Sequence, residues 1–336
     1  MRIVHELERH KWSDFVSHHP RGNVFQSCEM YDVYRDTEGY KPIFIAVLGD
    51  DDEVLGVLLS VIQTEKSFVL KDLTARAVIW GGPLVKDDDM SVMHALLSSY
   101  DDIVKSSVLY TEFRNLWDIS DNHTSFEKNG YVRHEHLNFL IDLSRGRDEV
   151  FAKLSSSKRR QVRRGLEKAE IVIAEDESEI TDYYGVLRDY YSEVIKKPLP
   201  PLSFFLNFHR ILRPQEKGVT FLVKSNGETI GGIVCPITRN YDRNVIYELY
   251  VVGSREHDNL FPSVLATWAP IEWGARNGFD HFDFMGAGRP GVSYGVREFK
   301  AKFGGDMVSY DRFRKIHRPI LNGFSQIGFR LWRLLH

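Results

Sequence analysis

A run of basic side chains in the middle of the chain is its most distinctive chemical feature. Between residues 153 and 168, seven lysines and arginines stand against a single acid, Glu167. The serines at 155–157 provide an N-cap for a helix that begins near Lys158. No carboxylate precedes these arginines by four positions, so helical neighbours do not neutralise them. Because unpaired guanidinium groups suit phosphate, we predict that this helix binds a phosphate-rich ligand, using Lys158, Arg159, Arg160, Arg163 and Arg164.

The alternative for this helix is a plain solvated face. Val162, Leu166 and Ala169 would form its narrow apolar stripe and leave the arginines exposed. Both interpretations predict a helix. They differ only in whether an anionic ligand binds to the helix.

A second group of candidate residues lies in the segment 279–305. A strand is expected at 279–285, followed by a glycine-rich loop and then by Phe299 and Lys300. The loop contains a GxGxxG pattern at 286–291, but Pro290 and the glycines around it cannot open the helix that would hold a pyrophosphate. Dinucleotide binding is therefore not expected. The sequence also lacks a Walker motif, a GxSxG motif and a set of zinc ligands.

The elements that must position these residues occur twice along the chain. Each half contains a hairpin, a strand, a loop, a helix and a returning strand. In the first half the two hairpin strands fall at 44–47 and 54–59, the next strand at 77–80, the helix at 89–104 and the returning strand at 107–113. In the second half the same elements fall at 221–223 and 229–234, 245–252, 261–277 and 279–285. We interpret this order as a duplication of one α/β module with mixed (α+β) sheets. The alternative is two unrelated α/β domains.

Composition and length agree with two folded domains. The chain has 336 residues, of which 43% are hydrophobic and 27% charged, and this balance excludes general disorder. A net charge of -3 argues against a protein that is basic throughout, such as a nonspecific DNA coater. Cys28 and Cys235 are too far apart in sequence to suggest a disulfide framework. With no signal peptide and no apolar run longer than residues 54–62, we expect a cytoplasmic protein.

The end of the chain is basic and amphipathic. Six lysines and arginines lie within residues 312–336, and from Pro319 onward apolar residues recur at helical spacing, at Ile320, Phe324, Ile327, Leu331 and Leu334. One interpretation is a closing helix packed on the body of the protein. The other is a helix that touches an anionic membrane surface as a peripheral contact.

The segment 282–304 resembles the C-terminal signature of the FemABX family of aminoacyl transferases. That signature reads approximately F-D-F-G-G, a variable loop, then F-K-x-x-F-G. This chain has F-D-F-M-G at 282–286 and F-K-A-K-F-G at 299–304, with Met285 where the family commonly has glycine. Residues 24–29 are similar to an early F-Q-S-x-E-W segment, and residues 156–165 to the start of the family's second domain. Arg35 is a candidate substitute for a family lysine associated with substrate phosphate.

The resemblance implies tandem acetyltransferase-like (GNAT) modules of the compact branch. It also implies a fold in which the C-terminal segment returns to the first domain. We therefore expect a first domain at 1–144, with 312–336 packing back on it, and a second at 145–311 that contains the catalytic segment. The implied reaction is transfer of an amino acid from aminoacyl-tRNA to an amine, typically of a peptidoglycan precursor in cell-wall biogenesis.

The resemblance also suggests roles for individual residues. Aminolysis of an ester needs stabilisation of an oxyanion, and Lys300, beside Phe299, is a candidate cation for it. Asp283 would position the amine or orient the glycine loop. In the alternative, Lys300 lies on the solvent side of an alternating strand. The candidate substrate-binding residues are Tyr247, Glu248 and Tyr250, on the strand before the expected cleft, together with Arg35, Arg289 and Tyr294.

Two other functions remain open from the sequence. One is a GNAT-type N-acyltransferase that uses acyl-CoA, although the loops at 81–88 and 253–259 lack the glycines that hold the CoA pyrophosphate in GNAT enzymes. The other is a tandem GNAT-like module that binds a partner without turnover. In the leading interpretation the chain needs no metal and no cofactor, and aminoacyl-tRNA and a phosphate-bearing precursor are its partners.

Overall fold

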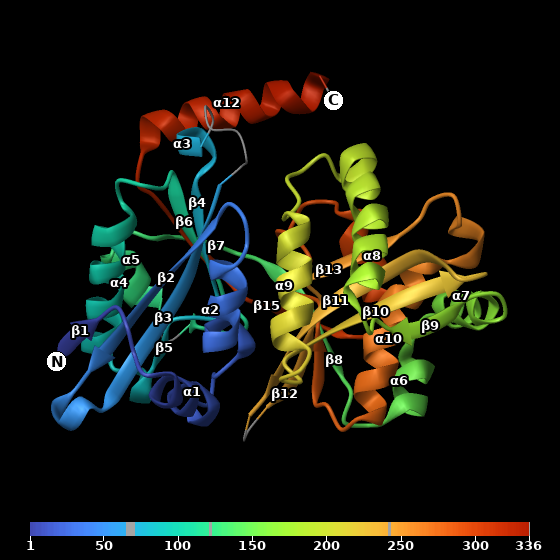
Figure 1. Cartoon of the computed structure of the whole chain (residues 1–336), viewed down its shortest axis with the longest axis horizontal. Coiled ribbons are helices and arrows are strands. Elements are labelled where there is room, and N and C mark those ends of the chain that lie inside the picture. The colour runs from blue at the N-terminus through green and yellow to red at the C-terminus, as the bar shows by residue number, and fades with distance from the viewer. Residues whose placement is uncertain (65–70, 121–122, 241–242, 336) are drawn as a thin grey trace. The chain divides into compact units, whose positions relative to one another are not determined.

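The computed structural model describes residues 1–64, 71–120, 123–240 and 243–335, and Figure 1 shows its secondary structure. The chain divides into two compact units. The first comprises Met1–Glu135 with Tyr310–His336, and the second comprises His136–Ser309. The predicted boundary at 144 differs from this division, because residues 137–142 form a strand in the sheet of the second unit.

The first unit contains a mixed sheet of eight strands. Their order is β1 (Arg2–Val4), β2 (Tyr40–Leu48), β3 (Val54–Gln63), β4 (Arg76–Trp80), β6 (Tyr110–Arg114), β16 (Arg312–Ile316) and β7 (Val132–His134), with β5 (Leu84–Val85) also on β3. The pair β4 and β6 is parallel, and the other pairs are antiparallel. The helices are α1 (Arg9–His18), α2 (Cys28–Arg35), α3 (Lys71–Thr74), α4 (Met90–Val104), α5 (His123–Lys128) and α12 (Pro319–Leu335).

The sequence of α4 accounts for where this helix begins and for which of its faces is buried. Asp89 caps its first turn by accepting from the backbone N–H groups of Ser91 and Val92. Its apolar side chains recur at helical spacing and are buried in the core with Ile45, Leu58 and other strand residues. Burial of this face stabilises the unit through the hydrophobic effect.

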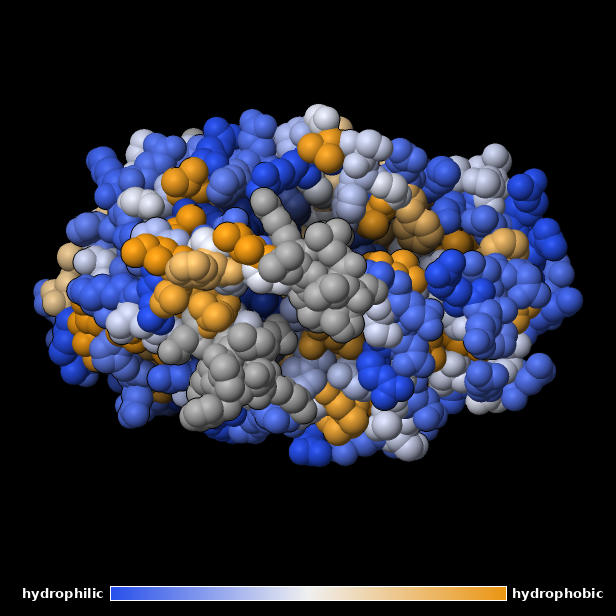
Figure 2. All heavy atoms as spheres, turned by 90° about the horizontal axis from the view of Figure 1, so that it is seen from above, coloured by the Kyte–Doolittle hydropathy of each residue, from blue (hydrophilic) through white to orange (hydrophobic). Residues whose placement is uncertain are grey.

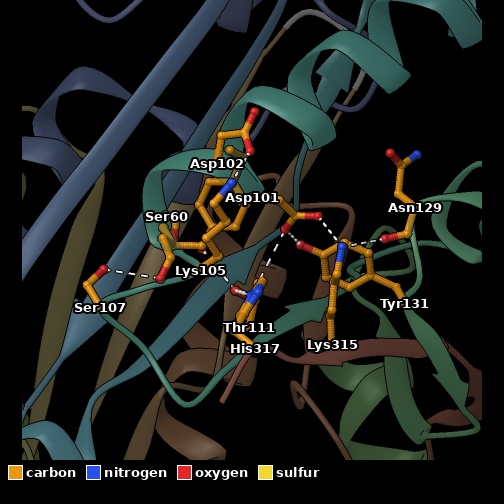
Figure 3. A network of polar contacts seen from close by, with 12 residues as sticks. Ser60, Asp101, Asp102, Lys105, Ser107, Thr111, Asn129, Tyr131, Lys315 and His317 are labelled. Carbon is orange, nitrogen blue, oxygen red and sulfur yellow. Dashed lines mark hydrogen bonds and ion pairs between the residues drawn. The ribbon is translucent and has the colours of Figure 1, made fainter. Parts of the chain in front are cut away.

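A buried polar network attaches the C-terminal strand β16 to the first unit (Figure 3). Lys315 Nζ lies 2.6 Å from a carboxylate oxygen of Asp101 on α4, and the Tyr131 hydroxyl donates to the other oxygen at 2.6 Å. Just beyond β16, His317 Nε2 lies 2.9 Å from Thr111 Oγ1, and burial lowers the pKa of this histidine. These contacts join segments that are far apart in sequence.

The second unit contains a second mixed sheet of eight strands. Their order is β15 (Asp306–Ser309), β8 (Leu137–Asp142), β14 (His281–Asp283), β12 (Asn244–Tyr247), β11 (Glu228–Arg239), β10 (Gly218–Ser225) and β9 (Glu170–Ile173), with β13 (Tyr250–Gly253) also on β11. Only the pair β12 and β14 is parallel among the described pairs. The helices are α6 (Arg147–Lys153), α7 (Ser156–Leu166), α8 (Glu177–Tyr190), α9 (Leu202–Leu212), α10 (Pro262–Arg276) and α11 (Gly295–Ala301), and α8 continues as a π-helical turn, Tyr191–Ile195.

The predicted fold class is confirmed. Each unit contains an antiparallel hairpin, then a strand, a helix and a returning strand that pairs in parallel with the strand before the helix. In the second unit the strand predicted at 245–252 is broken into β12 and β13 at Glu248 and Leu249. This break determines where the candidate site lies.

Candidate functional site

The sheet of the second unit opens where the parallel pair ends. The last paired residues are Tyr247 of β12 and Asp283 of β14, and the Glu248 N–H still donates to the Asp283 carbonyl at 2.9 Å. Beyond them, Phe284 N–H donates to Phe139 O of β8, while β13 continues along β11. The two chain segments therefore diverge, and Glu248 lies at the point of divergence.

Lys300 from α11 joins the two diverging segments. Its ammonium donates to Phe284 O at 2.8 Å and to Gly286 O at 2.9 Å, and it pairs with Glu248 Oε1 at 2.8 Å. The side chains of Lys300 and Glu248 are only 9% and 6% exposed. Since an ammonium has three N–H groups, each has an acceptor here. The alternating-strand alternative for Lys300 is wrong, because Lys300 is a buried residue of a helix.

Burial sets the charge state of the two carboxyl groups at this opening. Burial raises the pKa of Glu248, because the Lys300 ammonium only partly offsets the lost hydration. Burial also raises the pKa of Asp283 to about 6, although hydrogen bonds from Asn138 and Met285 act in the opposite direction. Asp283 Oδ2 has no hydrogen-bond partner among the described residues. Both groups are therefore stronger bases than ordinary carboxylates.

Asn138 on β8 fixes the start of the glycine-rich loop. Its amide donates to Asp283 Oδ1 at 2.7 Å, and its oxygen accepts from Gly286 N–H at 2.7 Å. Asp283 Oδ1 also accepts from Met285 N–H at 2.6 Å. These bonds hold Met285 at φ 55°, a left-handed conformation that favours glycine. Asp283 therefore orients the loop, one of the two roles expected for it.

Arg297 on α11 holds the rest of the loop. Its guanidinium donates to Ala287 O at 2.8 Å, to Val292 O at 2.9 Å and to Arg289 O. Neither Arg297 nor Asn138 was among the residues predicted for the site. The spacing of Arg297 and Lys300, three residues apart on one helix face, would have indicated a shared role once the helix was recognised.

The basic helix is confirmed as α7, but one of its residues is not exposed. Ser155 caps the helix by accepting from Lys158 N–H at 3.3 Å. Lys158 is only 5% exposed, and its ammonium lies 3.9 Å from the centre of the Phe299 ring. Burial, together with the charge of Lys302, lowers the pKa of Lys158 to about 8. Lys158 is therefore less accessible to a phosphate-rich ligand than the prediction required, and its ammonium packs against Phe299 instead.

The arginines of α7 fall into two groups. Arg159 donates to Leu154 O at 3.0 Å and to Ala152 O, so it secures the start of the helix. Arg160, Arg163 and Arg164 are exposed, and no carboxylate of the described residues lies within ion-pair distance of them. These three guanidinium groups are available to an anionic ligand.

The helix α7 lies against the start of α10. A Cβ on Gly165 would lie 2.8 Å from Leu260 O, and Arg164 lies 5.8 Å from the Phe261 ring centre. Gly253 lies close to the first turn of α10, since a Cβ on it would lie 2.3 Å from Ser263 N, and the Val264 and Leu265 N–H groups both donate to Phe261 O at 3.0 Å. Pro262, the first residue of α10, has no N–H. Backbone donors at this helix end are therefore poorly placed to hold a phosphate.

The other predicted site residues lie in different surroundings. Tyr247 is buried, and burial raises its pKa to about 12. Tyr250 packs against Phe205, with ring centres 5.3 Å apart. Arg289 and Tyr294 are exposed around the glycine-rich loop.

Arg35 belongs to the first unit and already has anionic partners. It pairs with Asp32 at 2.7 Å and with Asp36 at 2.8 Å on the surface of α2. Of the predicted site residues, the structure brings together Glu248, Asp283 and Lys300. Phe299, which precedes Lys300 in α11, packs against Lys158 of α7.

The described residues contain no group of three or more His, Cys, Asp or Glu side chains arranged to hold a metal ion. Among the same residues, no helix is long and apolar enough to cross a membrane.

Comparison with known proteins identifies the type of fold. Residues 153–301 match the family model described as an acetyltransferase (GNAT) domain. Comparison with curated proteins finds no match. The crystal structure of FemX is similar over 97% of this chain and 100% of that chain, with 16% identity and a TM-score of 0.70.

Two further solved structures share this arrangement. L-PGS from Bacillus licheniformis matches over 98% of this chain and 99% of that chain, with 14% identity and a TM-score of 0.59. A tandem GNAT protein from the clavulanic acid biosynthesis pathway, solved without AcCoA, matches over 95% and 99%, with 13% identity and a TM-score of 0.59. At these identities the likeness establishes the tandem fold.

Proposed function

We propose that this chain, an acyltransferase with the tandem GNAT-like fold of the FemABX type, transfers an amino acid from aminoacyl-tRNA to an amine. The observation that supports this donor best is on α7. Three exposed arginines without carboxylate partners lie on α7, which packs against the start of α10. Such a surface suits a polyphosphate backbone better than a single pyrophosphate held by backbone N–H groups.

The reaction would take place at the opening between β12 and β14. The amine nitrogen attacks the ester carbonyl carbon, a C–N bond forms, and the C–O bond to the ribose breaks. Glu248 is the proposed proton acceptor, since burial raises its pKa, and it would return the proton to the leaving ribose oxygen. Lys300 and Asp283 would position Glu248 and the glycine-rich loop beside it.

The proposed acceptor is an amine of a cell-wall precursor or a similar phosphate-bearing molecule. The resemblance of residues 282–304 to the FemABX signature implies this class of acceptor. Arg289 and Tyr294, which are exposed around the glycine-rich loop, are the proposed contacts for it. Arg35 is a weaker candidate than the sequence suggested, because Asp32 and Asp36 already pair with it.

The second candidate is an N-acyltransferase that uses acyl-CoA. The match of residues 153–301 to an acetyltransferase domain favours it. The occupied backbone N–H groups of Val264 and Leu265 at the start of α10 argue against it, because GNAT enzymes bind the CoA pyrophosphate on backbone N–H groups at a helix start.

Substitution of the α7 arginines tests the proposed donor. We expect the triple variant Arg160→Gln, Arg163→Gln, Arg164→Gln to bind a pool of charged tRNA more weakly than the wild type. Because each lost phosphate contact removes about 0.7–0.9 from the slope of log affinity against log salt, the slope should fall by about 2. Fluorescence anisotropy over a series of salt concentrations measures both quantities.

A matched control removes three other arginines from the same unit. Arg188, Arg210 and Arg276 are similarly exposed, but each pairs with a carboxylate. Their replacement by glutamine should leave the salt slope close to that of the wild type. Equal slopes for the α7 variant and the wild type would show that α7 is a solvated face.

A further inference from the structure

The helix α12 presents its apolar stripe to solvent. Ile320, Phe324 and Ile327 recur at helical spacing and are 76%, 62% and 57% exposed. Asn322, on another face of the same helix, is only 7% exposed. A helix that closes a core has the opposite arrangement, with apolar residues inside and polar residues outside. Over the described part of the stripe, Ile320, Phe324 and Ile327 therefore face solvent and do not pack against the body of the protein.

The surroundings of the stripe extend this apolar surface. Ile316, at the end of β16, is 48% exposed. Figure 2 views the molecule from the side on which α12 lies in Figure 1, and it shows one small cluster of hydrophobic residues on a face that is otherwise mostly hydrophilic. Exposed apolar side chains that recur on one helix face mark a contact site in a folded protein.

The charge of α12 and of the residue before it indicates what kind of surface the helix binds. Arg318 precedes the helix, and no carboxylate of the described residues lies within ion-pair distance of it. Residues 319–336 contain Arg330 and Arg333 and no Asp or Glu. The side chains after Gly328 lie outside the described residues. An apolar stripe with aromatic and cationic residues but no acids is typical of helices that lie in the interface of an anionic bilayer.

We propose that α12 docks the protein on the surface of an anionic lipid bilayer, with Ile320, Phe324 and Ile327 inserted among the acyl chains. This inference concerns location and does not depend on the proposed reaction. A protein surface, such as a second copy of this chain, would need no excess of positive charge, so the composition of α12 favours lipid.

Vesicle flotation of the full chain tests this proposal. We expect wild-type protein to float with vesicles that contain about one-third phosphatidylglycerol, and much less with phosphatidylcholine alone. The variant Ile320→Ser, Phe324→Ser, Ile327→Ser should lose binding to the anionic vesicles by about tenfold or more. These side chains are exposed, so the variant should keep the melting temperature of the wild type.

A control variant and a measurement of oligomeric state distinguish lipid binding from binding of a second copy of this chain. Val132→Ser with Met307→Ser removes apolar side chains that are 61% and 57% exposed elsewhere, and this variant should float like the wild type. Equal flotation with both kinds of vesicle, no flotation of the wild type, or unchanged flotation of the triple variant would each overturn the proposal. A wild-type dimer that the triple variant abolishes, without vesicle binding, would identify a second copy as the occupant and also overturn it.

Discussion

At the scale of single residues, the central finding is that Lys300 has no N–H group left over. Its donors are taken by Phe284 O, Gly286 O and Glu248. A role as the cation for an oxyanion would require one of these acceptors to be displaced. The geometry instead supports Lys300 as a positioning residue that holds Glu248 and the glycine-rich loop in place.

This role predicts a large loss of stability when Lys300 is removed. The variant Lys300→Met should lower the free energy of unfolding by about 3 kcal/mol, because it leaves the buried Glu248 carboxylate without its partner. Denaturation in urea, followed by circular dichroism, measures the change. A second substitution, Glu248→Met, should recover part of the loss, because it removes the unpaired charge.

The exposed neighbour Lys302 provides the control for this measurement. Lys302→Met should change the free energy of unfolding by less than about 0.5 kcal/mol. If Lys300→Met proved as stable as Lys302→Met, the contacts of Lys300 would not hold the loop, and the role as the oxyanion cation would again be favoured.

At the scale of elements, the glycine-rich loop gains its shape from side chains outside it. Asn138 and Arg297 bond to its backbone, and Met285 is held in a left-handed conformation. The sequence showed that Met285 departs from the family's glycine. The structure supplies the physical reason why glycine suits that position.

This conformation predicts an order of stability at residue 285. Met285→Val should be less stable than Met285→Gly by about 1–2 kcal/mol, because a β-branched side chain fits φ 55° poorly and glycine fits it well. Thermal and urea unfolding of the two variants measure the difference. Met307→Val, in the strand β15, should be nearly neutral as a matched control. Equal stability of the two variants at 285 would mean that the loop relaxes to another conformation.

Some elements could be predicted from the sequence because their signals are local. The serine cap and the charge run predicted α7 to within two residues at each end, and turn residues predicted the hairpins. The burial of Lys158 could not be predicted, because the ring that covers it comes from Phe299, far along the chain. The short segment around Lys300 fits both strand and helix periodicity, so the sequence allowed a strand there as an alternative to the helix that the structure contains.

At the scale of the whole molecule, the repeated order of elements predicted the tandem fold correctly. The return of residues 312–336 to the first domain was expected from the family resemblance, but the repeat itself predicts neither this return nor the strand order in each sheet. The strand β8 joins the second sheet and β16 joins the first, and long-range pairing of this kind leaves no periodic signal in the sequence. The candidate site could be predicted as a segment, but its partners Asn138 and Arg297 emerge only from the fold.

The two units also differ in what they could contribute to a reaction. The polar network around Asp101 and Lys315 secures the end of the chain to the first unit. The opening at Glu248 and the free arginines of α7 both belong to the second unit. The proposed transferase chemistry is therefore assigned to the second unit, and the proposed lipid contact to α12 of the first.

The most direct test of the proposed function is equilibrium binding of the two donor classes to the purified full chain. Charged tRNA and acetyl-CoA are titrated separately and then in competition, with binding followed by anisotropy and by calorimetry. We predict saturable binding of charged tRNA that acetyl-CoA does not displace and that weakens steeply with salt. Saturable binding of acetyl-CoA without any binding of tRNA would contradict the proposal.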